Sequence, residues 1–366
     1  MLNPCIKLMK ECFTFCSSCF PYYSETLITV NARKYQVVRL LGEKSLSFTY
    51  LVERTSPTSD ASNDATRLFA MKVISCPFGD IDTISNALQE IELYKYFHSA
   101  HIINLYGSQV SQELDGSRTI LILLPYYPLG SLQDMIDRNL LDGSTVSESQ
   151  CIKIMVSLCK GLDILHNSSS RAVGNMKASF DSVSITVSDD AASLLADTPL
   201  ELAVMSPTNY TEESFALLNM SPTTVLFRSD GTPLIGDLSI CSKVKFEITE
   251  SADLLAFKER IQENCSLPYL APELVSLKKG SLITKEVDIW SLGAILYFLM
   301  YGVSPFEREE QLNGTPIKYA IKKGQYSFPQ ESEYSSSLND IIISCLQVDP
   351  SMRSSPIQLI NALEDL

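Results

Sequence analysis

Short segments in which apolar and polar residues alternate dominate the first third of the chain. Residues 27–52 and 68–74 are rich in β-branched and aromatic side chains, which is the pattern of strands. Apolar positions at helical spacing follow at 83–97, and two further strand-like runs lie at 105–109 and 119–124. This order predicts a small sheet with one helix among its strands.

The pattern becomes helical beyond the predicted sheet. Helical periodicity covers residues 131–140 and 147–166, and it covers most of the chain again from Pro272 onward. Short strand signals return at 224–227 and 233–235, around a Ser-Asp-Gly turn. A sheet-rich part followed by a larger helical part predicts an α+β fold with two lobes.

The predicted boundaries divide the chain into a tail and two lobes. Residues 1–27 form the tail, residues 28–124 the smaller lobe and residues 125–366 the larger lobe. Residues 178–221 contain seven acidic residues and no Lys or Arg, which predicts an acidic insertion in the larger lobe. We interpret the insertion as a solvated loop, with a segment that docks a partner as the alternative.

Composition and charge narrow the class of protein. Hydrophobic residues make up 45% of the chain and charged residues 20%, which is typical of a globular protein. The formal net charge of −14 does not suit a nucleic-acid-binding protein, whose surface should be basic. The longest apolar run, at 289–300, is shorter than the roughly 18 residues that a spanning helix needs. We therefore predict neither nucleic-acid binding nor a transmembrane helix.

The N-terminal tail is rich in cysteine. Aromatic residues are mixed with these cysteines, and Lys7 and Lys10 lie among them, a composition that suits a segment at a membrane surface. One acyl chain anchors a protein marginally and two anchor it stably. The sequence therefore predicts membrane attachment through S-acylated cysteines, and a disordered tail with incidental thiols is the alternative. The four cysteines are Cys5, Cys12, Cys16 and Cys19.

Lys72 lies inside an apolar strand, Phe69–Val73. Burying a lysine is costly unless it is paired, and the helix that follows offers Glu90 and Glu92 as partners. A strand lysine that holds nucleotide phosphates and is oriented by a helix glutamate belongs to phosphoryl-transfer chemistry. A lysine whose stem crosses a half-buried strand with no ligand is the alternative.

Eight short motifs follow one another between residues 41 and 353. They are Leu41-Gly42, Ala70-Met71-Lys72, Glu90, Leu123–Tyr127, Asp237-Leu238-Ser239, Ala271-Pro272-Glu273, Asp288–Gly293 and Asp349–Arg353. In this order they resemble a eukaryotic protein kinase over residues 34–366, and the last three are hard to obtain by chance. The resemblance implies the two-lobed kinase fold, with ATP and Mg²⁺ as cofactors.

The resemblance also implies roles for individual residues. Pro125 would supply a backbone carbonyl to adenine and Tyr127 a backbone N–H, while Asp237 would bind a metal ion. Glu273 and Arg353 would form a buried ion pair, and the family pattern further implies that Asp288 anchors the backbone of the catalytic loop and that Ser266 is a phosphorylation site in the activation segment. The implied ATP-binding residues are Leu41, Gly42, Thr49, Ala70, Lys72, Glu90, Leu124, Pro125 and Tyr127.

The catalytic loop departs from the family pattern H-R-D-x-K-P-x-N. One alignment register places Asn175 at the catalytic Asp and Lys177 at the Lys, with the acidic insertion after them. The other register, counted back from Asp237 without a gap, places Asn219 at the catalytic Asp. Both registers leave Thr224 in the place of the metal-binding Asn. The glycine-rich loop is also reduced, since only its first glycine remains.

These departures decide the predicted function. Asn cannot accept a proton, and losing a general base typically slows a reaction about 10²- to 10⁴-fold. The sequence therefore predicts a pseudokinase or scaffold that holds ATP, with an active serine/threonine kinase as the alternative. The run Cys265–Glu273 is similar to the Numb-associated kinase family, and the cysteine-rich tail resembles its palmitoylated branch, which includes a fungal vacuolar-membrane kinase. This resemblance implies the cytosolic face of membranes, at the vacuole or Golgi.

Overall fold

A computed structural model of the chain describes residues 27–44, 46–55, 67–168, 185–187, 214–244 and 246–366. The chain divides into two compact units, each described here by itself. Unit 1 comprises Met1–Tyr96, Asn104–Tyr126 and Ala178–Thr208, and unit 2 comprises Phe97–Ile103, Tyr127–Lys177 and Asn209–Leu366.

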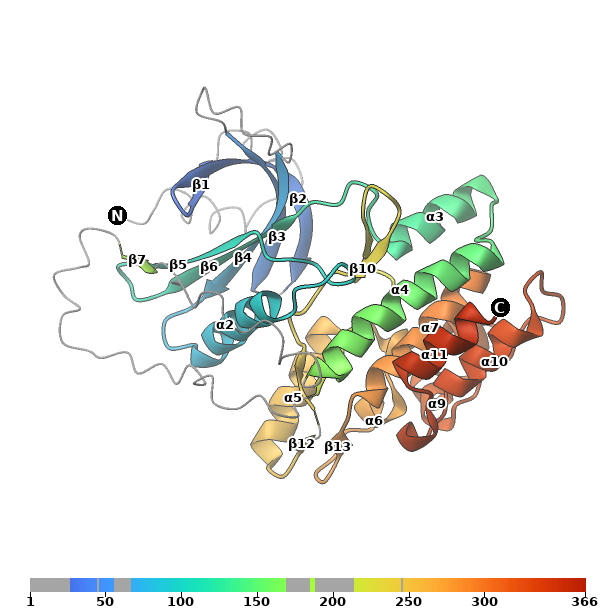
Figure 1. Cartoon of the computed structure of the whole chain (residues 1–366). Helices are drawn as coiled ribbons and strands as arrows, with labels where there is room; N and C mark the ends of the chain where they lie inside the picture. Colours follow the sequence, from blue (N-terminus) through green and yellow to red (C-terminus); the bar gives the residue numbers. More distant parts are fainter. Residues whose placement is uncertain (1–26, 45, 56–66, 169–184, 188–213, 245) are drawn as a thin grey trace. The chain divides into compact units, whose positions relative to one another are not determined.

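Unit 1 is built on one sheet with the strand order β1-β2-β3-β4-β6-β5-β7 (Figure 1). Neighbouring strands are antiparallel except for β5 and β7, which are parallel. Asn31 and Ala32 join β1 to β2 with positive φ angles of 48° and 62°, the backbone that a two-residue hairpin turn requires. The strands are β1 Leu27–Val30, β2 Arg33–Lys44, β3 Ser47–Arg54, β4 Leu68–Cys76, β5 Gly107–Gln112, β6 Arg118–Pro125 and β7 Ile185–Val187.

The core of unit 1 lies on one face of this sheet. Alternating positions of β4 are buried, so Phe69, Met71 and Val73 point to the core while Ala70 and Lys72 face the other way. Tyr35 meets Phe69 edge to face, with ring centroids 5.7 Å apart. The helix α2, Ile81–Tyr96, packs against β4 and β6. This alternation leaves Lys72 on the face where a polar group is tolerated.

Unit 2 is mainly helical, with short two-stranded pairings between its helices (Figure 1). Several of its helices begin with a serine whose side chain caps the first turn and is met by Asp, Glu or Gln three residues later, as at Ser131 and Ser147. The helices are α3 Leu132–Asp142, α4 Glu148–His166, α5 Ser251–Asn264, α6 Pro272–Val275, α7 Glu286–Tyr301, α8 Pro305–Asn313, α9 Ile317–Lys323, α10 Ser336–Cys345 and α11 Pro356–Glu364. The short strands are β8 Phe215–Ala216, β9 Val225–Phe227, β10 Pro233–Ile235, β11 Ser242–Lys243, β12 Phe246–Glu247 and β13 Leu282–Ile283.

Helix α7 is the centre of unit 2. Every residue from Val287 to Met300 is buried, which matches its almost continuous apolar sequence. A Cβ atom at Gly293 would lie 2.5 Å from the Cβ of Cys345 in α10, so this close helix approach requires glycine. No single helix of the described residues is long and apolar enough to cross a membrane, although the pair α7 and α8, bent by 64°, has the combined length and composition.

The predicted α+β fold is confirmed, and the predicted limits of the main helices and strands agree closely with those of the structure. The segment of unit 1 that holds β5 and β6 ends at Tyr126, two residues beyond the predicted lobe boundary. Residues 97–103 belong to unit 2, where the N–H of Ile103 donates to the carbonyl oxygen of Ile235 and the N–H of Ile235 donates to the carbonyl oxygen of His101. Residues 214–221, which the prediction placed in the acidic insertion, are instead part of the packed unit 2, because their apolar run 215–218 is buried.

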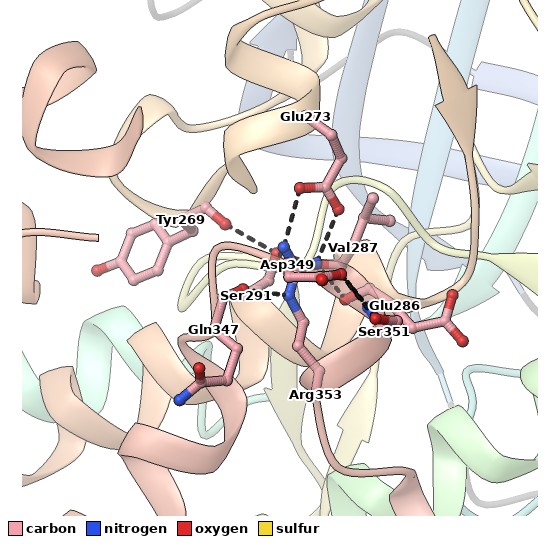
Figure 2. A network of polar contacts seen from close by, with 9 residues as sticks. All are labelled: Tyr269, Glu273, Glu286, Val287, Ser291, Gln347, Asp349, Ser351 and Arg353. Atoms are coloured by element: carbon pink, nitrogen blue, oxygen red, sulfur yellow. Dashed lines mark hydrogen bonds and ion pairs between the residues drawn. The ribbon is translucent and has the colours of Figure 1, made fainter. Parts of the chain in front are cut away.

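A network around Arg353 ties the C-terminal part of unit 2 to helices α6 and α7 (Figure 2). Its guanidinium donates to both carboxylate oxygens of Glu273, at 2.7 and 2.9 Å, and to the backbone oxygens of Glu286 and Gln347. The same group lies 5.3 Å from the ring centroid of Trp290. The ion pair implied by the kinase resemblance is therefore present, with Arg353 fully covered.

We expect Glu273→Ala to lower the free energy of unfolding by about 3–5 kcal/mol, because it leaves the buried Arg353 charge without its carboxylate. Urea unfolding of the full chain measures this loss. The matched control is Glu364→Ala, which breaks the exposed pair with Lys160 at 3.6 Å and should cost about 1 kcal/mol or less. Equal losses in the two variants would contradict the prediction.

Candidate nucleotide and catalytic site

Lys72 and Glu90 form an ion pair inside unit 1. Lys72 Nζ lies 2.8 Å from Glu90 Oε1 and 2.7 Å from Oε2, and the side chains are 13% and 3% exposed. Strand β4 presents the lysine and α2 presents the glutamate, so the pair joins the helix to the sheet. A nearly buried ammonium held by both carboxylate oxygens has a fixed position from which it can bind an anion.

The other implied ATP-binding residues of unit 1 lie on adjacent strands. Gly42 of β2 pairs with Thr49 of β3, and Thr49 pairs in turn with Lys72 of β4. Ala70 pairs with Leu124 of β6, one residue before Pro125 ends that strand. The hydrogen-bonded register therefore gathers residues that are far apart in the sequence. Leu41 lies beside Gly42 in β2.

Tyr127 is the first residue of unit 2 after this strand. Burial raises the pKa of its phenol, and the charge of the nearby Arg228 acts in the opposite direction. The group of Tyr127 that the kinase resemblance assigns to adenine is its backbone N–H.

Asp288, fully buried in α7, binds the backbone of the segment that follows β8. Its Oδ2 atom accepts the N–H of Leu217 at 2.8 Å and its Oδ1 atom accepts the N–H of Leu218 at 2.9 Å. His166 Nε2, at the end of α4, lies 2.9 Å from Oδ2. A buried carboxylate needs such partners, and these three fix where the next residues of the loop lie.

The loop turns sharply after this anchor. Leu218 has a φ of 68°, in the left-handed region that costs a leucine roughly 1–2 kcal/mol. This turn directs Asn219 toward Asp237, and Asn219 Nδ2 donates to Asp237 Oδ2 at 3.1 Å. Asn219 is 2% exposed, and its Oδ1 atom has no hydrogen-bond partner. The strained backbone thus positions an amide beside a carboxylate.

The Thr224 hydroxyl forms hydrogen bonds with the backbone of the same loop. Its hydroxyl lies 3.2 Å from the carbonyl oxygen of Asn219 and 3.1 Å from that of Ser221, and it accepts the N–H of Ser221 at 3.0 Å. The side chain therefore holds the backbone of residues 219–224 in a compact turn.

Asp237, the residues that follow it and helix α5 form a connected set of contacts next to this loop. The N–H of Ser239 donates to Asp237 Oδ1 at 2.9 Å, and Leu238 is buried. Arg260 of α5 reaches the carbonyl oxygen of Ser239 at 3.4 Å, and the thiol of Cys265 lies 3.5 Å from the carbonyl oxygen of Leu218. Helix α5 and its C-cap residue Cys265 therefore contact both the backbone after Asp237 and the loop that contains Leu218.

A family comparison identifies this arrangement. The model of the protein kinase domain matches residues 55–171 and 220–363. The chain belongs to the protein kinase family.

Named relatives match this chain over nearly its whole length. It is 45% identical to serine/threonine-protein kinase ENV7 of Saccharomyces cerevisiae over 95% of this chain and 96% of the relative. It is 30% identical to serine/threonine-protein kinase ppk13 of Schizosaccharomyces pombe, over 93% of each chain. Identity to human serine/threonine-protein kinase 16 is 24%, over 94% of this chain and 93% of the relative.

The kinase geometry bears on the two registers that the sequence left open. The residues that Asp288 anchors are Leu217 and Leu218, and the residue that faces Asp237 is Asn219. These contacts favour the register without a gap, and the family match resumes one residue later, at 220. Asn175 and Lys177, which the other register assigns, lie outside the described residues, as do Cys5, Cys12, Cys16 and Cys19.

Other contacts of the kinase site had no signal in the sequence. Nothing in the order of residues joins His166 to Asp288 or Arg260 to Ser239, because these partners lie on separate helices and loops.

Ser266, the implied phosphorylation site, is exposed and precedes the short 3₁₀ helix Leu267–Tyr269. The exposed Ser266 is accessible to a kinase that would phosphorylate it.

We expect Asp288→Asn to loosen the loop, because it removes the charge that accepts two backbone N–H groups. Hydrogen bonds to charged groups contribute about 1.5–3 kcal/mol each, so amide exchange at Leu217 and Leu218 should accelerate at least about tenfold. Hydrogen exchange with peptide-level readout over residues 214–222 measures this. Asp340→Asn, the same change at an exposed position of α10, should leave these rates unchanged. Unchanged rates in Asp288→Asn would contradict the anchoring role.

Proposed function

We propose that this chain is a protein-kinase-fold protein that binds ATP and transfers its γ-phosphate weakly or not at all. The observation that carries the proposal is the contact of Asn219 with Asp237, in the loop that Asp288 anchors. An amide cannot accept the proton of a substrate hydroxyl. Loss of such a base typically slows a reaction about 10²- to 10⁴-fold.

ATP binding is the part of kinase function that the residues support. The Lys72–Glu90 pair is complete, and Gly42, Thr49 and Lys72 lie in register on neighbouring strands. Protein kinases in general use a lysine of this kind to hold the nucleotide phosphates. These contacts would have no catalytic purpose in a protein without phosphotransfer, so we propose that nucleotide binding regulates a scaffold.

An active serine/threonine kinase is the second candidate. It is favoured by the relatives, since a chain 45% identical to this one is named a serine/threonine-protein kinase. The Oδ1 atom of Asn219 is an acceptor without a hydrogen-bond partner, and it could receive the hydrogen of a serine or threonine hydroxyl. Positioning alone contributes strongly to phosphoryl transfer, so a slow reaction would remain in this case.

Two measurements on the full-length chain separate these candidates. We expect ATP to bind, and Lys72→Met to weaken binding at least about tenfold because one charged hydrogen bond to phosphate is lost. Asn219→Asp should raise transfer of radiolabelled phosphate to the chain or to a generic acceptor protein by about 10²-fold or more. Asn361→Asp, the same change at an exposed position of α11, is the control and should change neither quantity.

The outcomes are distinct. Phosphate transfer by the unaltered chain that disappears in Lys72→Met would establish the active kinase and overturn the leading proposal. ATP binding without transfer would support the pseudokinase. No ATP binding would leave a kinase-fold scaffold that acts through its surface alone.

We further propose that acylated cysteines of the tail hold the protein on the cytosolic face of a membrane, at the vacuole or Golgi. The support is the composition of the tail, in which cysteines alternate with aromatic residues near two lysines. More than one acyl chain would make the attachment stable.

Changing Cys12, Cys16 and Cys19 together to serine should move the protein from the membrane pellet to the soluble fraction, because one remaining cysteine allows at most marginal anchoring. Fractionation of cells that express the variant measures this. The matched control changes Cys76, Cys159 and Cys241, which are buried in the fold, to alanine one at a time. Continued pelleting of the tail variant would contradict acylation as the anchor.

A further inference from the structure

The Mg²⁺ that protein kinases use with ATP is poorly matched by the donors of this chain. Asp237 is the sole ionisable side chain among residues 217–224 and 237–239. Both of its carboxylate oxygens already accept hydrogen bonds, Oδ2 from the Asn219 amide at 3.1 Å and Oδ1 from the Ser239 N–H at 2.9 Å. A cation at Asp237 would have to compete with N–H groups at each oxygen.

The orientation of the Asn219 amide makes this competition worse for a cation. Its nitrogen must face Asp237, because the flipped amide would place two acceptor oxygens at hydrogen-bond distance with no proton between them. The amide therefore presents positively polarised hydrogens to the carboxylate. Its oxygen is turned away and has no partner. Asn219 and Asp237 thus offer no pair of oxygens to a shared metal ion.

Thr224 stands where the family has its second metal-binding side chain, and it is engaged elsewhere. Its hydroxyl contacts two backbone carbonyl oxygens of the loop and accepts the N–H of Ser221. A hydroxyl has one hydrogen and two lone pairs, so little of its capacity remains. Mg²⁺ demands close to octahedral oxygen coordination and is usually held by one or two carboxylates together with substrate phosphates. This site offers a single carboxylate, Asp237, and both of its oxygens already accept N–H groups, so Mg²⁺ could bind there only by displacing them.

We propose that this chain binds adenine nucleotide without a divalent cation, and that the N–H of the Asn219 amide takes over from the cation as the partner of Asp237. This inference rests on the proposed ATP binding. An aspartate at position 219 would place two carboxylates at hydrogen-bond distance, an arrangement that needs a proton or a cation between them. The neutral amide instead donates its own N–H to Asp237, so this contact needs no metal.

The first test measures ATP affinity of the full-length chain by calorimetry, in EDTA and in excess MgCl₂. For the unaltered chain we expect dissociation constants that agree within about threefold, because no metal-dependent contact is lost. For Asn219→Asp we expect ATP binding at least about tenfold weaker in EDTA than in MgCl₂, because two adjacent carboxylates then require the cation. Asn361→Asp should behave as the unaltered chain.

The second test needs no nucleotide. Thermal unfolding of the same three proteins is followed in EDTA and in MgCl₂. The melting temperature of the unaltered chain should not respond to Mg²⁺. Asn219→Asp should melt lower than the unaltered chain in EDTA and recover with Mg²⁺, while Asn361→Asp should show neither effect. This arm reports directly on whether residue 219 determines the need for a cation beside Asp237.

The outcomes separate this inference from the proposed function. ATP binding by the unaltered chain that weakens tenfold or more in EDTA overturns the inference and leaves ATP binding intact. Absence of ATP binding under both conditions overturns the proposed function and the metal-free nucleotide site together. Stabilisation of the unaltered chain by Mg²⁺ that disappears in Asp237→Asn also overturns the inference, because it shows that Asp237 binds the cation despite Asn219.

Discussion

The buried carboxylate of Asp288 is the constraint on which the candidate catalytic region depends. It lies in the most completely buried helix of unit 2 and accepts hydrogens from two consecutive backbone N–H groups and a contact from His166. A buried charge is tolerated only when its hydrogen-bonding capacity is used. The loop N–H groups and the His166 ring therefore stabilise the buried carboxylate, and the carboxylate in turn holds the loop in place. The position of Asn219, the strained φ of Leu218 and the contact with Asp237 all follow from this anchor.

This anchor acts on the backbone and not on the loop side chains. Leu217 and Leu218 contact Asp288 through their backbone N–H groups, while their own side chains are buried in unit 2. This anchor therefore places no demand on the side chain at position 219, and the Arg353–Glu273 network and the Lys72–Glu90 pair are both formed in a chain that has Asn219 beside Asp237. Both ion pairs link separate elements of the fold, Arg353–Glu273 within unit 2 and Lys72–Glu90 within unit 1.

The sequence predicted the fold and the polar pairs of the site, and it left the catalytic register open. The alternation of buried and exposed residues around Lys72 predicted the sheet of unit 1, and the apolar run of α7 predicted the buried helix of unit 2. Both patterns are visible in the sequence because burial selects apolar residues at these positions. The register was ambiguous because Asn occurs at both candidate positions, and the decisive contact joins residues about seventy positions apart. The role of Thr224 was also hidden, since a hydroxyl can bind a metal ion or close a turn with the same sequence.

The absence of a side chain at Gly293 has a consequence for how this chain tolerates change. Helices α7 and α10 approach so closely there that a single methyl group has no space, whereas the leucines at 217 and 218 contribute their backbone N–H groups to Asp288. A side chain at the helix crossing therefore works against the packing of α7 on α10, whereas the side chain at position 219 takes no part in the hydrogen bonds that Asp288 makes with the loop. The path of the backbone that presents residue 219 is thus set independently of the side chain that it presents.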